Sequence, residues 1–304
     1  MSNGPAIVTR GLTKHYGEVR ALEDLNLEIA QGEIFGFLGP NGAGKTTTMR
    51  TILDLIRPTS GTATIMGLDS HEDAVEIRQH IGYVPGDLAM YPKLTGRELL
   101  TYFANLRGGV SWSVVDEFAG RLDSDLSRKI GNLSSGNRQK VGLIQAFMNK
   151  PDILILDEPS SGLDPLVQQE FQAMLREVAG EGRTVFLSSH TLSEVERVAD
   201  RVAIIREGRL AVVDTMESLK EKAIRKVTLH FADPISESVF AGVAGVKSVS
   251  VKGTAATVSF EGAMSSLLRA ATDHDVINLT SSEADLEEIF LAYYRGPGTS
   301  EVVG

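Results

Sequence analysis

The 304-residue sequence contains no cysteine, which excludes disulfide bonds, zinc ribbons and thiol catalysis. It also lacks any apolar run approaching the ~20 residues that a helix needs to cross a bilayer. The first residues, Met1 to Lys14, hold no apolar segment of the kind that marks a signal peptide. We therefore expect a cytoplasmic protein that reaches a membrane only through a partner.

Positive charge is also scarce. Only 30 Lys and Arg face 40 Asp and Glu, so the formal net charge is -10 and the pI is near 5.2. Proteins that bind nucleic acid usually carry a basic surface, so we expect no nucleic-acid partner. The chain shows no internal repeat, and its length suits about two domains.

The most informative stretch runs from Gly39 to Thr47 and fits the phosphate-binding pattern G-x-x-x-x-G-K-[ST]. An apolar run precedes it and helical spacing follows over residues 48–56, which predicts a strand, a turn and a helix. Backbone N–H groups of such a turn and of the helix N-terminus bind phosphate. Lys45 suits the outer phosphates, and the Thr46 hydroxyl suits Mg²⁺. The candidate nucleotide-binding residues of this loop are Gly39, Asn41, Gly42, Ala43, Gly44, Lys45, Thr46 and Thr47.

Up to about residue 220, short apolar strands alternate with amphipathic helices, which is typical of a doubly wound α/β fold. The strand signals fade between residues 93 and 150, where we predict a largely helical subdomain. We assign residues 1–220 to this α/β domain.

The sequence pattern changes from about Arg225, where alternating apolar residues predict strands around a turn at Gly253. Ser282 and Asp285 are predicted to cap a last helix. The apolar face of that helix consists of Leu286, Ile289, Phe290 and Tyr293. We assign residues 221–304 to a small C-terminal α+β domain.

Two acidic residues, Asp157 and Glu158, follow the apolar run Ile153 to Leu156, which suits a strand buried on both faces. At such a strand end, Asp157 is placed to ligate Mg²⁺ together with Thr46. Glu158 is placed to orient or deprotonate the attacking water. The plainer interpretation, a solvated strand end, leaves unexplained why the pair follows a buried strand downstream of a phosphate loop.

Two further features have a structural and a functional interpretation. Ser134 and Gly136 open a predicted helix and either form a second anion site or provide an ordinary serine N-cap. Tyr16, ahead of the phosphate loop, either stacks on an adenine ring or is a core or turn tyrosine.

In order and spacing, these motifs resemble the ATP-binding subunit of an ABC transporter from about Ile7 to Ser218. The resemblance implies a P-loop NTPase core of ABC ATPase type with ATP and Mg²⁺ as ligands. It makes residues 133–139 the signature, residues 161–164 the D-loop and Tyr16 the adenine-stacking aromatic. It also makes His190 the switch histidine, which joins Lys45 and Glu158 as a catalytic residue.

The same resemblance implies partners. Two subunits, identical or close paralogues, would pair head to tail, so that Ser134 and Gly136 of one complete the Lys45 site of the other. A separate transmembrane permease would hold the pair on the inner face of the cell membrane. The stretch Asp285 to Phe290 resembles the C-terminal extension of exporter-type ATPases.

The sequence departs from the family pattern at several positions. Ser135, Asn137 and Gly162 are mild changes, but Gly86 stands where a metal-binding glutamine is usual. Asp87 is one candidate to replace it, since carboxylates bind Mg²⁺. Water is the favoured alternative, because Mg²⁺ usually keeps several waters.

The function that these motifs predict is ATP hydrolysis that drives export through the permease. The alternative is a non-transport ABC-type ATPase in DNA repair or translation. Such proteins resemble this chain in the motifs but carry zinc cysteines, long coiled coils or two cassettes, none of which the sequence contains. The sequence does not select the exported substrate among drugs, antibiotics, lipids, sodium and polysaccharides.

Overall fold

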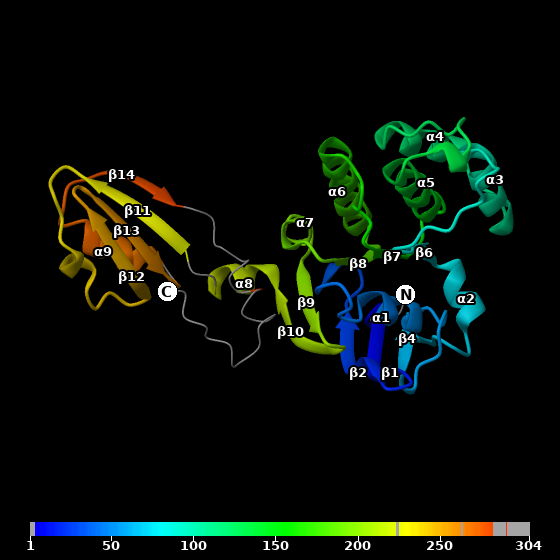
Figure 1. Cartoon of the computed structure of the whole chain (residues 1–304), viewed down its shortest axis with the longest axis horizontal. Helices are drawn as coiled ribbons and strands as arrows, with labels where there is room; N and C mark the ends of the chain where they lie inside the picture. Colours follow the sequence, from blue (N-terminus) through cyan, green and yellow to red (C-terminus); the bar gives the residue numbers. More distant parts are fainter. Residues whose placement is uncertain (1–3, 223–224, 263, 282–289, 291–304) are drawn as a thin grey trace. The chain divides into compact units, whose positions relative to one another are not determined.

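The computed structural model describes residues 4–222, 225–262, 264–281 and 290. The chain divides into two compact units, Met1–Val213 and Asp214–Gly304 (Figure 1). The boundary falls a little ahead of the expected one at residues 220 and 221, within the last strand of the first unit's central sheet. Each unit has its own hydrophobic core.

The central sheet of the first unit has the strand order β10-β9-β3-β8-β7-β6. The strands from β9 to β6 pair in parallel, as the α/β pattern predicts. Every residue of β3, β7 and β8 is buried, so their continuous apolar runs are explained by cover on both faces. The bounds are β3 (Ile34–Leu38), β6 (Ile81–Val84), β7 (Ile153–Asp157), β8 (Thr184–Ser189), β9 (Arg201–Arg206) and β10 (Arg209–Thr215).

A second, antiparallel sheet has the order β2-β1-β4-β5. In β2, Leu25, Leu27 and Ile29 are buried while Asn26 and Glu28 are exposed, as the alternation predicts. Helix α1 (Lys45–Ile52) lies between the two sheets and contacts β7, β2 and β4 (Figure 1). The bounds are β1 (Ile7–Tyr16), β2 (Val19–Ile29), β4 (Ser60–Ile65) and β5 (Leu68–Asp69).

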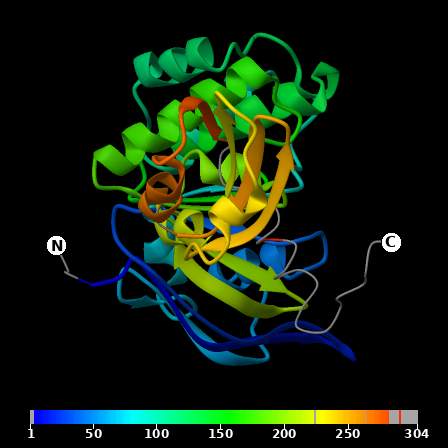
Figure 2. The same cartoon turned by 90° about the vertical axis from the view of Figure 1, so that its left-hand side faces the viewer.

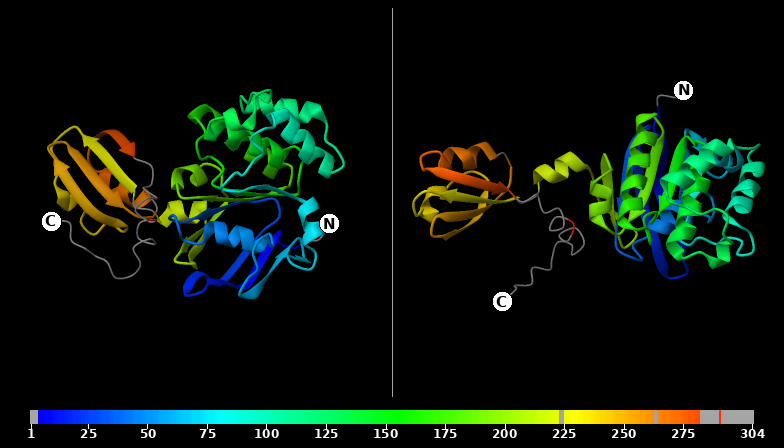
Figure 3. Two further views of the ribbon diagram at one scale, coloured as in Figure 1. Left: turned by 45° about the vertical axis from the view of Figure 1, so that its right-hand side comes forward. Right: turned by 90° about the horizontal axis from the view of Figure 1, so that it is seen from above.

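The helical subdomain follows β6 and groups α3, α4 and α5 together (Figure 3). Thr95 and Glu98 form a capping box at the start of α3. Edge-to-face contacts of Phe118 and Phe171 with Phe147 join α4, α5 and the core helix α6. The bounds are α3 (Gly96–Leu106), α4 (Trp112–Arg121), η1 (Ile130–Asn132), α5 (Ser135–Phe147) and α6 (Pro165–Gly180).

Two helices of this unit are short. Helix α1 starts at Lys45 rather than at residue 48, and it ends early because Asp54 adopts a positive φ of 52°. Helix α7 (Leu192–Glu196) closes in a tight turn, in which the Val195 carbonyl accepts the N–H groups of both Val198 and Ala199. The remaining short helix of this unit is α2 (Ala74–Gln79).

The second unit contains an antiparallel sheet of order β12-β13-β11-β14 (Figure 2). Leu267 and Ala271 of α9 are buried in one core with Val227, Leu229 and other inward residues of the sheet. The bounds are α8 (Met216–Lys222), β11 (Arg225–Phe231), η2 (Glu237–Phe240), β12 (Val246–Lys252), β13 (Ala255–Phe260), α9 (Met264–Ala271) and β14 (Val276–Ser281).

The predicted last helix lies outside the described residues, apart from Phe290, which is 2% exposed. Its proposed caps Ser282 and Asp285 therefore stay predictions. Within the described ranges, no helix is long and apolar enough to cross a membrane.

Candidate nucleotide site

The loop from Gly39 to Thr47 joins the buried strand β3 to α1, as its pattern predicts. Gly44 caps α1 at a φ of 111°, and a Cβ atom there would lie 2.6 Å from the carbonyl oxygen of Ala21. Only glycine fits this backbone. Helix α1 thus begins directly on the loop, and the unpaired N–H groups of its first turn are available to phosphate.

Three predicted catalytic residues, Lys45, Glu158 and His190, lie together at the carboxyl ends of β3, β7 and β8. The buried Lys45 ammonium donates to the carbonyl oxygens of Gly39 at 2.6 Å and Pro40 at 3.3 Å. It also forms an ion pair, without hydrogen-bond geometry, with Oε1 of Glu158 at 3.2 Å. Oε2 of Glu158 lies 2.8 Å from Nδ1 of His190. One carboxylate therefore contacts both the phosphate-loop lysine and the predicted switch histidine.

Asp157 is fully buried at the end of β7, where its Oδ1 accepts a 2.6 Å hydrogen bond from the Ser188 hydroxyl. Its Oδ2 is buried and has no hydrogen-bond partner among the described residues. An unpaired buried carboxylate oxygen suits a cation. A carboxylate and a hydroxyl are oxygen donors of the kind that Mg²⁺ prefers, so the chemistry of Asp157 and Thr46 fits this metal, and their joint role as its ligands stays a prediction. Burial, and then the charge of Asp157, raises the pKa of the Tyr83 hydroxyl, which keeps that phenol neutral.

Gly86, the position of the missing glutamine, lies against this free oxygen. A Cβ atom on Gly86 would be 3.2 Å from Oδ2 of Asp157. Bare backbone therefore faces the proposed metal ligand. Asp87 is exposed, and the choice between its carboxylate and water as a further ligand stays a prediction.

The backbone of Glu158 adopts a φ of 50°, which is uncommon for a non-glycine residue and concentrates at functional sites. Its N–H donates to Ser188 Oγ at 3.1 Å, so the same hydroxyl holds Asp157 and Glu158. The sequence analysis did not identify Ser188 or its neighbour Ser189 as residues of the site. The available signal was a pair of serines at the end of a buried strand, directly before His190.

Ser134 and Gly136 lie at the start of α5. Ser134 Oγ accepts the N–H of Asn137 at 3.2 Å, which is the plain N-cap interpretation. A Cβ atom on Gly136 would lie 2.1 Å from the carbonyl oxygen of Gly162, so the signature packs directly on the D-loop. The contacts described for these two residues join them to α5 and the D-loop, and their role toward a second subunit stays a prediction.

Tyr16 lies at the end of β1 and is 49% exposed, which excludes the core interpretation. The Lys14 ammonium lies 4.9 Å from the centre of its ring. The half-exposed ring is compatible with stacking on a base, a role that stays a prediction.

Comparison with known proteins identifies the family. The ABC transporter family matches residues 22–161. The bacitracin transport ATP-binding protein BcrA of Bacillus licheniformis is 35% identical over 298 residues, covering 95% of this chain and 97% of the relative. The chain belongs to the ATP-binding subunits of ABC transporters. This ABC ATPase binds and hydrolyses ATP, so the predicted fold and activity are confirmed.

Other relatives agree with this assignment. BcrA of Enterococcus faecalis is 33% identical over 300 residues, covering 96% of the ABC ATPase and 97% of the relative. The solved structure of an ATP-binding subunit of an ABC transporter is 29% identical and has a TM-score of 0.65, covering 71% of this chain and 92% of that one. A dimeric bacterial ABC transporter cassette is 26% identical with a TM-score of 0.65, covering 69% and 98% of the two chains.

Proposed function

We propose that this chain is the ATP-hydrolysing subunit of an ABC export system and drives a separate membrane permease. The observation that carries the proposal is the contact of Lys45, Glu158 and His190 beside the buried Asp157. The relatives named above are transport subunits, which favours this function over a DNA-repair or translation ATPase.

The catalytic roles follow from the contacts. On ATP binding, Lys45 exchanges its bonds to Gly39 and Pro40 for bonds to the outer phosphates. Glu158 takes a proton from the attacking water. Because Nδ1 of His190 bonds to Glu158, its Nε2 is left for the γ-phosphate.

Thr46 and Asp157 would hold Mg²⁺, which supplies neutralisation of phosphate charge when bound. The other loop residues, Asn41, Gly42, Ala43 and Thr47, supply backbone donors, and Tyr16 stacks on the adenine.

The active form is a head-to-tail dimer, either of this chain or with a close paralogue. Ser134 and Gly136 of each subunit complete the phosphate site of the other. The similar solved cassette is dimeric, which supports a dimer of this ATPase. In free-energy terms, the γ-phosphate favours the closed dimer, and its hydrolysis allows reopening.

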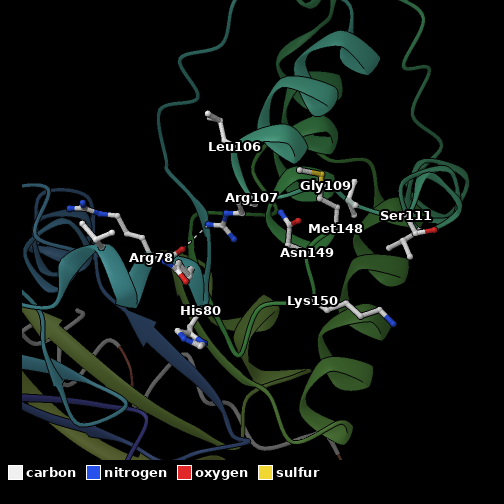
Figure 4. A pocket seen from close by; sticks show the side chains of 13 residues that line it. Arg78, His80, Leu106, Arg107, Gly109, Ser111, Met148, Asn149 and Lys150 are labelled. Atoms are coloured by element: carbon white, nitrogen blue, oxygen red, sulfur yellow. Dashed lines mark hydrogen bonds between the residues drawn. The ribbon is translucent and has the colours of Figure 1, made fainter.

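The permease would dock on a pocket of about 1210 Å³ that lies between α2 and the helical subdomain (Figure 4). Its 13 lining residues include Arg78, Arg107 and Lys150 but no acidic residue, in a chain of net charge -10. The exposed side chains of Val75 and Leu106 add an apolar rim. We therefore assign to it a short cytoplasmic segment of the permease that combines acidic and apolar side chains, which would hold the ATPase at the inner face of the membrane.

This docking site is tested by co-purification of the ATPase with its co-expressed permease. The variants Arg78→Glu and Lys150→Glu should lose the permease while ATP binding persists. Lys252→Glu, an exposed lysine of the second unit, is the control. Unchanged co-purification of both pocket variants would place the permease elsewhere.

The proposed substrate follows from how much of this chain each kind of relative matches. The bacitracin-transport relatives match about the whole chain, 95% and 96% of it, whereas the multidrug relative YbhF of Escherichia coli matches 77%. Bacitracin is therefore the first cargo to test, by the resistance of cells that express this ATPase with its permease.

The hydrolytic role is tested with the purified Glu158→Gln protein. We expect ATP binding to persist, turnover to fall about 10²- to 10⁴-fold, and ATP-dependent dimerisation to increase. Glu117→Gln, on the exposed face of α4, is the matched control and should behave as wild type. Near-normal turnover by Glu158→Gln would remove the general base from the proposal.

A further inference from the structure

Glu194, in the first turn of α7, connects two loops of the catalytic site. Its Oε2 accepts hydrogen bonds from the Ser160 hydroxyl at 2.6 Å and from the Ser189 hydroxyl at 2.8 Å. Ser160 is 8% exposed and Ser189 is 1% exposed, whereas Glu194 is partly exposed, so both bonds are partly shielded from water. Hydrogen bonds to an ionised carboxylate are about twice as strong as neutral ones.

The two serines flank the residues that act on ATP. Ser160 follows Glu158 by two positions and leads into the D-loop, while Ser189 immediately precedes His190. Ser189 Oγ also accepts the N–H of Thr191 at 2.9 Å, so it holds the chain on both sides of the histidine. Glu194 thus ties together the segments whose side chains meet in the 2.8 Å contact between Glu158 and His190.

Capping of α7 does not account for this arrangement. Thr191 is the N-cap of α7, and Glu194 occupies the third helical position, where an acidic side chain often bonds back to the cap backbone. Here the carboxylate reaches out of the helix instead, to Ser189 and to Ser160 on another loop.

We propose that Glu194 is a positioning residue that holds His190 in register with Glu158. The inference rests on the proposed hydrolytic role of Glu158 and His190. It predicts that loss of the carboxylate lowers kcat, because the histidine is misplaced, while ATP still binds through the phosphate loop.

The test compares Glu194→Ala, Glu194→Gln, His190→Ala and the double variant Glu194→Ala/His190→Ala in the full chain. Glu194→Ala should lower kcat by about ten- to a hundredfold with KM for ATP little changed, since a shift near 1 Å costs about 10²-fold. Glu194→Gln should recover part of kcat, because an amide oxygen still accepts both hydroxyl protons. Ser193→Ala, on the exposed face of the same helix, is the control and should match wild type.

The double variant separates positioning from a structural effect. If Glu194 acts through His190, Glu194→Ala should lower kcat no further in the His190→Ala background. Fully additive losses would overturn the proposal, as would a wild-type kcat in Glu194→Ala. If Glu194→Ala does not fold, the same additivity is measured with Glu194→Gln. A wild-type rate in His190→Ala alone would instead contradict the proposed catalytic role of the histidine.

Discussion

Replacing Gly136 by alanine tests the packing of the signature on the D-loop. The added Cβ would lie 2.1 Å from the carbonyl oxygen of Gly162, so one of the two backbones must move by about 0.9 Å to reach even 3.0 Å. Neither atom is the end of a flexible side chain, so the strain cannot relax by a change of rotamer. Overpacking of this kind costs about 1–3 kcal/mol.

Both stability and turnover should respond. For a domain of this size, each kcal/mol lowers Tm by about 2–4 °C. The D-loop and the signature both lie close to the proposed dimer face, where a shift near 1 Å costs about 10²-fold in rate. We therefore expect Gly136→Ala to bind ATP with about wild-type affinity but to hydrolyse it at least about tenfold more slowly.

The control is Gly120→Ala in α4, where no atom lies within 4 Å of the new Cβ. It should keep full turnover and gain a little stability, because alanine is favoured over glycine in a helix by about 0.5–1 kcal/mol. The measurements are thermal unfolding, ATP binding and the rate of phosphate release. Wild-type Tm and turnover in Gly136→Ala would refute the argument from close packing.

The other predictions concern the metal, pH and the second unit. Gly86→Ala, which places Cβ 3.2 Å from Oδ2 of Asp157, should raise the Mg²⁺ concentration for half-maximal hydrolysis. Asp87→Ala should leave the Mg²⁺ titration unchanged if water completes the metal shell. A shift only in Asp87→Ala would favour the Asp87 carboxylate as a metal ligand. Arg121 donates hydrogen bonds to Glu177 at 2.6 and 2.7 Å and holds the pKa of that carboxyl below its usual value. The pair therefore stabilises the protein at pH values above the ordinary pKa of 4.5, and this stabilisation is lost as the pH falls through the lowered pKa. Arg121→Met should therefore lower Tm at pH 7, and the difference from wild type should shrink below about pH 4.5; a constant difference would point to lost packing instead. A chain without residues 223–304 should bind ATP with unchanged affinity, and weaker binding by a well-folded truncation would show that the second unit contributes to the nucleotide site.

Much of the site could be predicted because its chemistry is local in sequence. The phosphate loop needs glycine at tight backbone positions, a lysine and a hydroxyl within nine consecutive residues, and this pattern is visible without the fold. The burial of β7 and the acids at its end follow from an apolar run ending in Asp157 and Glu158. The ends of helices were harder to predict from the sequence, because a single residue of positive φ such as Asp54 decides where a helix stops.

The sequence by itself determined the family, the order of elements and the candidate residues for binding phosphate, since each depends on short patterns along the chain. Only the tertiary structure decided which residues far apart in the sequence contact each other. Glu194 meets Ser160 from 34 positions away, and Gly86 lies against Asp157, because parallel strands bring their carboxyl ends to one edge. No local pattern encodes such contacts, which depend on how the strands β3, β8, β7 and β6 are ordered in the sheet.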